Sequence, residues 1–177
     1  MRVIAGSRRG AKLLAPRGRE TRPTGDRVRE ALFSILVRVD GARVLDLFAG
    51  SGALAIEALS RGAAEATLID SSPAAITTIR RNLGALGLSA EVRRTDAADF
   101  LQRARTDARQ YDLVFLDPPY RQASGLGPQL TGALASVLAP GARVVAESDR
   151  RAPLHLELPL LDERRYGDTL IRIHGPR

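Results

Sequence analysis

Cysteine is absent from this chain of 177 residues, and histidine occurs only twice, at His155 and His174. Without cysteine the protein has no disulfide, no thiolate metal ligand and no cysteine nucleophile. Because both histidines lie near the carboxyl terminus, a histidine-based metal site or a serine triad would depend on this pair alone. We therefore expect chemistry that requires no metal.

Long apolar runs are also missing. No stretch approaches the roughly 18 uninterrupted apolar residues of a membrane span, and residues 1–6 contain no apolar segment of the signal-peptide kind. With 44% hydrophobic and 27% charged residues, the composition is that of an ordinary globular domain. We expect one compact unit in the cytoplasm, without membrane contact.

Acidic residues are scarce in the first fifth of the chain. Residues 1–38 hold ten basic residues against three acidic ones, a net charge of +7, whereas residues 39–177 hold 17 of each sign. This clustering is typical of a polyanion-binding extension on a neutral body. We therefore divide the chain into a basic extension (1–38) that binds nucleic acid and a second domain (39–177). A general preference for arginine is the alternative, but it does not explain the clustering.

Within the extension, two short apolar runs flank a turn-rich, basic segment. The pattern predicts a small β-hairpin with Arg8 and Arg9 at its tip. Residues 17–25 have the composition of a loop, and apolar residues then recur at helical spacing from Asp26, a candidate N-cap. Three residues are expected partly on the polar face of this helix: Arg27, Arg29 and Glu30.

From residue 43 onward, short apolar runs alternate with helical segments, which predicts βαβ units and a parallel sheet with helices on both faces. The pair Gly167-Asp168 is a two-residue hairpin signal that adds an antiparallel pair. The expected fold is α/β and Rossmann-like, with a seven-stranded mixed sheet. Strands are predicted at 44–48, 66–70, 90–93, 111–116, 142–147, 163–166 and 169–173, and helices near 52–61, 73–86, 97–105 and 125–138.

A glycine-containing turn follows the first predicted strand. Gly50 and Gly52 allow a tight turn and the close approach of a ligand, and the start of the next helix offers free N–H groups to an anionic group. Asp70, at the end of the second strand, would bind ribose hydroxyls. The spacing Gly-x-Gly-x-x-Ala thus predicts an adenosine-containing cofactor, with a plain strand-to-helix turn as the alternative.

A carboxylate, Asp46, precedes these glycines. It would repel a pyrophosphate but attract the positively charged amino-acid end of S-adenosylmethionine, which also carries a sulfonium. Asp96, after the third strand, is well placed to bind the amino group of adenine. The predicted cofactor-binding residues are Asp46, Ala49, Gly50, Ser51, Gly52, Asp70, Asp96 and Ala97.

The fourth predicted strand ends in Asp117-Pro118-Pro119-Tyr120. Ligands of a doubly wound sheet bind beyond the carboxyl ends of its strands. The prolines fix φ and lack N–H donors, so the Asp117 carboxylate and the Pro118 carbonyl would converge as acceptors beside the ring of Tyr120. Such a site suits a planar exocyclic amine, and we predict Asp117, Pro118 and Tyr120 as catalytic residues.

These segments resemble known methyltransferases. Residues 46–52 resemble the first motif of class I S-adenosylmethionine-dependent methyltransferases, and residues 117–120 resemble the motif of those that methylate exocyclic amines of bases. Residues 22–33 (RPTGDRVREALF) and 50–63 (GSGALAIEALSRGA) resemble the RsmD family, bacterial enzymes that act on guanine N2 of small-subunit ribosomal RNA. The resemblance continues to residues 166–168. Minor departures are Ser34, Ala55 and Asp70, where Asn, Gly and Glu are usual.

The resemblance implies transfer of a methyl group from S-adenosylmethionine to guanine N2 of 16S ribosomal RNA, either free or within a partly assembled 30S subunit, and we expect a monomer. The catalytic motif alone leaves open an adenine-N6 methyltransferase, against which the N-terminal resemblance argues, and the glycine turn alone leaves open an NAD-dependent oxidoreductase. An inactive RNA-binding assembly factor is a third alternative. The residues expected to bind the RNA are Arg8, Arg9, Arg22, Arg27, Pro119 and Tyr120.

Overall fold

The computed structural model describes residues 1–16, 25–36 and 39–176, and for residues 120–126 the backbone alone. Helices and strands alternate along most of this part of the chain, as the sequence predicts. The helices are α1 (Asp26–Ile35), α2 (Ala53–Ser60), α3 (Pro73–Leu86), α4 (Ala97–Thr106) and α5 (Tyr120–Ala135). The strands are β1 (Arg43–Asp46), β2 (Glu65–Asp70), β3 (Glu91–Arg94), β4 (Tyr111–Leu116), β5 (Leu138–Asp149), β6 (Leu160–Tyr166) and β7 (Thr169–His174).

The strands form one seven-stranded sheet in the order β3-β2-β1-β4-β5-β7-β6. Strands β1 to β5 run parallel, while β7 lies antiparallel between β5 and β6. The β6–β7 turn contains Gly167 with a left-handed φ of 63°, which glycine adopts without strain. The predicted mixed sheet and its antiparallel end are therefore confirmed.

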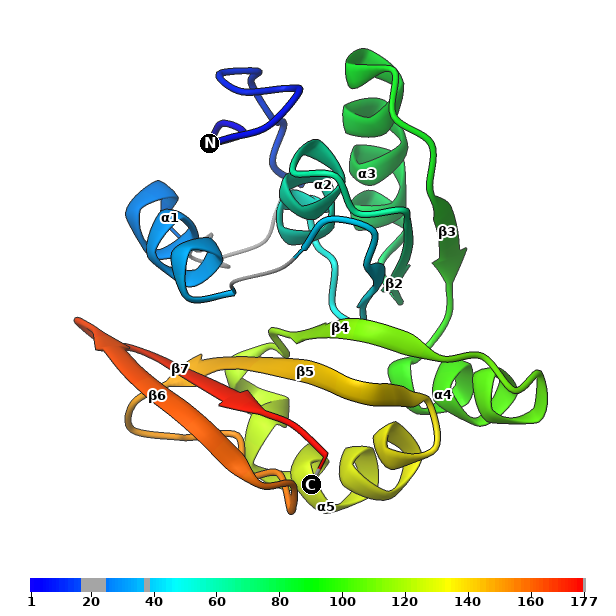
Figure 1. The fold of residues 1–177 in the computed structure, drawn as a ribbon, viewed down its shortest axis with the longest axis vertical. Coiled ribbons are helices and arrows are strands. Elements are labelled where there is room, and N and C mark those ends of the chain that lie inside the picture. Colours follow the sequence, from blue (N-terminus) through cyan, green and yellow to red (C-terminus); the bar gives the residue numbers. More distant parts are fainter. Residues whose placement is uncertain (17–24, 37–38, 177) are drawn as a thin grey trace.

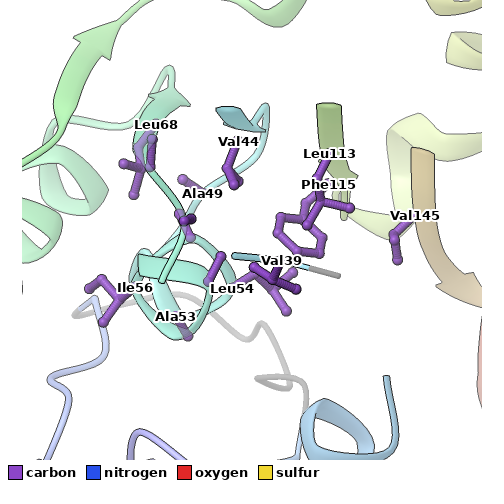
Figure 2. Packing of buried hydrophobic residues seen from close by; sticks show 14 of the residues in the cluster. Val39, Val44, Ala49, Ala53, Leu54, Ile56, Leu68, Leu113, Phe115 and Val145 are labelled. Atoms are coloured by element: carbon purple, nitrogen blue, oxygen red, sulfur yellow. The ribbon is translucent and has the colours of Figure 1, made fainter. Parts of the chain in front are cut away.

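Side-chain alternation along the strands builds two apolar layers. In β4, Leu113 and Phe115 point to one face and Val114 and Leu116 to the other. Figure 1 shows α1, α2 and α3 on one side of the sheet and α4 and α5 on the other. In the first layer, Phe115 packs with Leu54 and other buried residues of the strands and α2 (Figure 2). Each face of the sheet thus carries its own apolar layer beneath the helices.

The boundaries of several elements differ from the prediction, and β6 begins at Leu160 rather than at residue 163. β1 ends at Asp46, and residues 47–48 belong to a turn. The fourth body helix was expected over 125–138, but α5 begins at Tyr120 and ends at Ala135, and β5 starts at Leu138. Within this helix, a Cβ at Gly127 would lie 1.9 Å from the carbonyl oxygen of His155. Gly127 therefore allows a close approach inside the helix.

The N-terminal hairpin, residues 1–14, is present in a compact form. Val3 and Ala11 share a backbone hydrogen bond of 2.9 Å, Gly10 donates to Val3 at 2.8 Å, and Arg2 and Lys12 form a single antiparallel bridge. Val3 and Leu13 are buried in the same apolar cluster as α2 and α3. The functional division at residue 38 stays a prediction, but this hairpin shares its core with the body.

One residue of α1 lies on the opposite face from the one predicted. Asp26 is not the N-cap, because Gly25 occupies that position without a side-chain hydrogen bond. Arg27 and Glu30 are exposed, whereas Arg29 is fully buried and donates to the Arg2 carbonyl and to the Asp26 carboxylate. Burial lowers the pKa of Arg29. Arg29 therefore joins α1 to the N-terminal hairpin.

The helices of the described chain are too short or too polar to cross a bilayer. The described residues also include no group of three or more histidine, aspartate or glutamate side chains placed to hold a metal ion.

Candidate active site at the carboxyl ends of the parallel strands

The predicted cofactor and substrate residues meet where the strand order reverses. β1 lies between β2 and β4, with Asp46 in register with Leu68 on one side and Phe115 on the other. The Leu47 N–H also donates to the Phe115 carbonyl at 3.2 Å. The segments that follow β1, β2 and β4 therefore share one edge of the sheet, the edge at which α/β proteins bind ligands.

The glycine turn, residues 49–52, is held close to β2. Ala49 donates its N–H to the Ile69 carbonyl at 3.0 Å, and Gly52 donates to the Ala49 carbonyl at 2.6 Å. Gly50 and Gly52 have left-handed φ values of 57° and 79°. A Cβ on Gly52 would also lie 3.0 Å from Leu68 Cδ2. The backbone conformation therefore favours glycine at position 52, and the packing beneath the turn leaves little room for a Cβ.

Asp46 is a buried carboxylate whose Oδ2 has no hydrogen-bond partner within the described protein. Burial raises its pKa to about 7, and the negative charge of Asp70 contributes in the same direction. The backbone N–H groups of Ala55 and Phe48 donate to Asp46 and partly oppose the shift. A buried carboxylate with an unused oxygen matches a ligand that brings a positive charge. Asp46 therefore fits the ammonium end of S-adenosylmethionine.

Asp70 is buried at the end of β2 and contacts two backbone amides. Its Oδ2 accepts from the N–H of Gly50 at 2.9 Å, and its Oδ1 accepts from the N–H of Ser72 at 2.8 Å. A carboxylate oxygen can accept more than one hydrogen bond, and the contact of Asp70 with a ribose hydroxyl stays a prediction. Asp70 thus orders both the glycine turn and the start of α3, in addition to its predicted cofactor contact.

We expect Asp70→Ala to weaken S-adenosylhomocysteine binding by about 1–3 kcal/mol, or roughly 5- to 150-fold, because it removes an acceptor and loosens the glycine turn. Isothermal titration calorimetry measures the change. Asp99→Ala is the control, since Asp99 is exposed in the first turn of α4. Equal dissociation constants for parent and Asp70→Ala proteins would remove Asp70 from the site.

Asp96 and Ala97 lie where β3 leads into α4. Asp96 is the N-cap of α4, and its Oδ1 accepts from the Ala98 N–H at 2.8 Å. Its side chain is exposed, and Ala97 is buried. The capping bond fixes the Asp96 carboxylate beyond the end of β3. Its contact with adenine stays a prediction.

The double-proline segment follows β4 directly. Asp117 is half-buried, Pro118 is buried, and Pro119 is the N-cap of α5 with φ −54° and ψ 135°. No peptide bond in the described chain is cis. Tyr120 is the first residue of α5, but its side chain lies outside the described part. Asp117 therefore stands beyond β4, next to the β1 end that carries Asp46.

The predicted RNA-binding arginines occupy different environments. Arg9 and Arg27 are exposed, whereas Arg8 is half-buried and its Nε donates to the Leu86 carbonyl at 2.6 Å. Arg8 thus attaches the hairpin to the end of α3, and Arg9 is the better candidate for a free RNA contact. Arg22 lies outside the described residues.

Three polar residues of α2 and α3 were not predicted from the sequence. Each is buried and holds the N-terminal hairpin: Glu57 accepts from the N–H groups of Ile4 and Ala5, Ser60 accepts from the Arg8 N–H, and Asn82 contacts Leu14. The available signal was a polar residue on the apolar face of a helix. That signal marks burial, but it does not identify the partner.

Comparisons with known proteins agree with this geometry. A family model described as conserved hypothetical protein 95 matches residues 1–175. The Ribosomal RNA small subunit methyltransferase D of Haemophilus influenzae is 38% identical over 98% of this chain and 93% of its own. The Escherichia coli protein of that name is 47% identical over 69% of this chain and 61% of its own.

A solved structure gives the same result for the fold. The candidate methyltransferase yhhF from Escherichia coli matches with a TM-score of 0.85 and 38% sequence identity, over 98% of this chain and 96% of that one. The match to this structure and the match to the Haemophilus influenzae protein each cover nearly the whole of both chains. The chain therefore belongs to the RsmD family of ribosomal RNA small-subunit methyltransferases.

Proposed function

We propose that the protein transfers a methyl group from S-adenosylmethionine to the exocyclic N2 of a guanine in 16S ribosomal RNA. The observation that carries the proposal is the pairing of two carboxylates at adjacent strand ends. Asp46, buried and with an unused oxygen, suits a cationic cofactor, while Asp117 before two prolines suits an amine substrate. Family membership supports the ribosomal RNA as the substrate class.

When bound, the cofactor would supply a methyl group made electrophilic by its sulfonium, and the neutral thioether S-adenosylhomocysteine would be the leaving group. The protein's part is binding and alignment. Asp46 would hold the ammonium group, the Ser51 amide of the glycine turn would approach the carboxylate, and Asp70 and Asp96 would bind the ribose and the adenine. Each of these assignments follows from the position of the residue at the strand ends.

The substrate's part of the site centres on Asp117. Its carboxylate and the Pro118 carbonyl would accept the two N–H groups of the amine, orient its lone pair and stabilise the positive charge that develops on nitrogen. The nitrogen proton would then leave to Asp117 or to water. Pro119 and Tyr120 would contact the base, which must be unpaired or flipped to reach the site.

Mass mapping of the methylated nucleosides tests this function. Purified protein, S-adenosylmethionine and small-subunit RNA, both free and in partly assembled 30S particles, are expected to yield N2-methylguanine at a single position. N6-methyladenine would instead identify an adenine enzyme. Binding of cofactor and RNA without methyl transfer, on both free RNA and 30S particles, would identify an assembly factor. Binding of a dinucleotide would identify an oxidoreductase.

We further propose that the basic extension (1–38) binds the RNA, that the protein acts as a monomer and that it works in the cytoplasm. Because each lost phosphate contact lowers the slope of log K against log salt by about 0.7 for single strands or 0.9 for duplex, Arg9→Ala should weaken RNA binding and flatten this slope. Salt titrations of RNA binding measure both effects.

Arg103→Ala is the matched control, since Arg103 is an exposed arginine of α4 on the opposite side of the sheet. We expect it to bind RNA as the parent does. Parallel salt slopes and equal affinities for the parent and Arg9→Ala proteins would count against the hairpin as an RNA contact.

A further inference from the structure

The N-terminal hairpin touches the glycine turn through one buried amide. Asn82 of α3 lies between them: its Oδ1 accepts from the Leu14 N–H at 2.9 Å, and its Nδ2 donates to the Leu14 carbonyl at 3.0 Å and to the Ser51 carbonyl at 2.9 Å. Leu14 ends the hairpin and Ser51 is the centre of the glycine turn. One side chain thus joins the proposed RNA-binding segment to the proposed cofactor-binding segment.

The three bonds depend on one another because an amide has a donor end and an acceptor end. The two bonds to Leu14 allow only one orientation of the Asn82 amide, with Oδ1 toward an N–H and Nδ2 toward a carbonyl. In that orientation the second N–H of Nδ2 points to the Ser51 carbonyl. The hairpin therefore sets the direction of the hydrogen bond that holds Ser51.

Other contacts show that the hairpin is docked as a unit. Glu57 accepts from the N–H groups of Ile4 and Ala5 at 2.7 and 3.0 Å, and a Cβ on Gly6 would lie 1.8 Å from the Ser60 carbonyl oxygen. These contacts lie on α2, away from Ser51. A second contact reaches the turn directly, since the Ser51 hydroxyl lies 3.9 Å from the sulfur of Met1.

We propose that Asn82 is a positioning residue that makes RNA binding and cofactor binding cooperative; this rests on the function proposed above. RNA held by the hairpin stabilises its docked position, the docked hairpin fixes the Asn82 amide, and the amide fixes Ser51 in the conformation that receives the cofactor. By linkage, the cofactor must strengthen RNA binding by the same factor that RNA strengthens cofactor binding.

Calorimetry with S-adenosylhomocysteine, in the absence and presence of saturating small-subunit RNA, measures this coupling. In the parent protein we expect RNA to tighten S-adenosylhomocysteine binding by about 5- to 10-fold, within the usual range of coupling between sites. In Asn82→Ala the factor should fall to about one, and in Asn82→Asp as well, because the new carboxylate oxygen would face two carbonyl oxygens. Circular dichroism establishes that each variant is folded.

Ser60→Ala is the matched control. The Ser60 hydroxyl accepts from the Arg8 N–H at 2.9 Å and donates to the Ala5 carbonyl at 2.6 Å, so its loss removes two hairpin bonds without touching residue 51. We expect this variant to keep the parent's S-adenosylhomocysteine affinity and its coupling. If Ser60→Ala lost the coupling to the same extent as Asn82→Ala, general loosening of the hairpin would explain the effect and the role of Asn82 would be wrong.

Hydrogen exchange gives a readout that does not depend on the variants' affinity. RNA added without cofactor should slow exchange of the amides of residues 50–52 in the parent and leave them unchanged in Asn82→Ala. If the RNA binds the parent but changes neither cofactor affinity nor this exchange, the proposed coupling is wrong and the proposed function still stands. Failure of the RNA to bind at all would instead contradict the proposed function.

Discussion

Replacing Asp117 by alanine is expected to reduce methyl transfer by at least about a hundredfold, while the dissociation constant for S-adenosylhomocysteine changes by less than about threefold. Asp117 follows β4 and is assigned to the substrate amine, whereas the cofactor residues follow β1, β2 and β3. Its loss removes the acceptor that orients the amine and the charge that stabilises it in the transition state. Single-turnover transfer to RNA and calorimetry with the cofactor product separate the two effects.

The same strand supplies a control. Asp112 lies at the opposite end of β4, where its carboxylate pairs with Arg43 at 2.9 Å on the surface. Asp112→Asn should leave both turnover and cofactor affinity near the parent values, because exposed ion pairs contribute at most about 1 kcal/mol to stability. If Asp117→Ala lost cofactor binding as severely as activity, the carboxylate would belong to the cofactor site instead.

The sequence predicted the strands of the site better than the helix beside it. β2 and β4 are short apolar runs with clear ends, and Asp46, Asp70 and Asp117 fall at strand ends as the pattern requires. The start of α5 was placed five residues too late. The predicted helix already contained Gly127, but its close contact with the His155 backbone depends on the tertiary structure and has no signal in the sequence.

Arg29 and Arg8 show a second limit. Both counted toward the basic surplus of the extension, yet Arg29 is fully buried and the Nε of Arg8 is bonded to the Leu86 carbonyl. Net charge is a property of composition, and it does not distinguish a solvent-exposed arginine from one that donates hydrogen bonds to backbone carbonyls. The exposed candidates, Arg9 and Arg27, could be separated from them only by the fold.

Asn82 marks what the sequence could not show about the site. Its place on the buried face of α3 could have been noticed from the surrounding apolar spacing, since Ile79 and Leu83 share that face. Its partners could not, because Leu14 and Ser51 lie 68 and 31 residues away and are bound through their backbone atoms. The backbone carbonyl is common to all residues and the N–H to all except proline, so the sequence does not show which backbone groups a side chain will bind.

Cofactor affinity should fall steeply as the pH is lowered through about 7, because Asp46 must ionise to bind an ammonium group. Burial first, and the charge of Asp70 second, raise the pKa of Asp46 to about 7 in the free protein. Below that pH the folded protein holds a proton that the complex does not, so binding releases it and affinity drops by about tenfold per pH unit. Calorimetry from pH 5.5 to 8, in buffers of different ionisation enthalpy, measures the affinity and counts the protons.

The free protein's own stability should change in the opposite direction. An aspartate in the unfolded chain has a pKa near 3.8, so between about pH 4 and 7 the folded state binds more protons at Asp46 than the unfolded state. Its contribution to stability therefore decreases as the pH rises across that window and stays constant above it. Asp46→Asn, which cannot ionise, should bind the cofactor weakly at pH 8 and release no proton on binding. Neither its cofactor affinity nor its stability should then show the pH dependence that we assign to Asp46.

Asp70→Asn tests the cause of the shift. Removing its negative charge should lower the pKa of Asp46, so the midpoint of the affinity profile moves to lower pH even though the plateau affinity also falls. A parent protein whose affinity for S-adenosylhomocysteine is the same at pH 5.5 and pH 8 would show that the ammonium group lies elsewhere. A midpoint that stays fixed in Asp70→Asn would instead leave desolvation as the sole origin of the raised pKa.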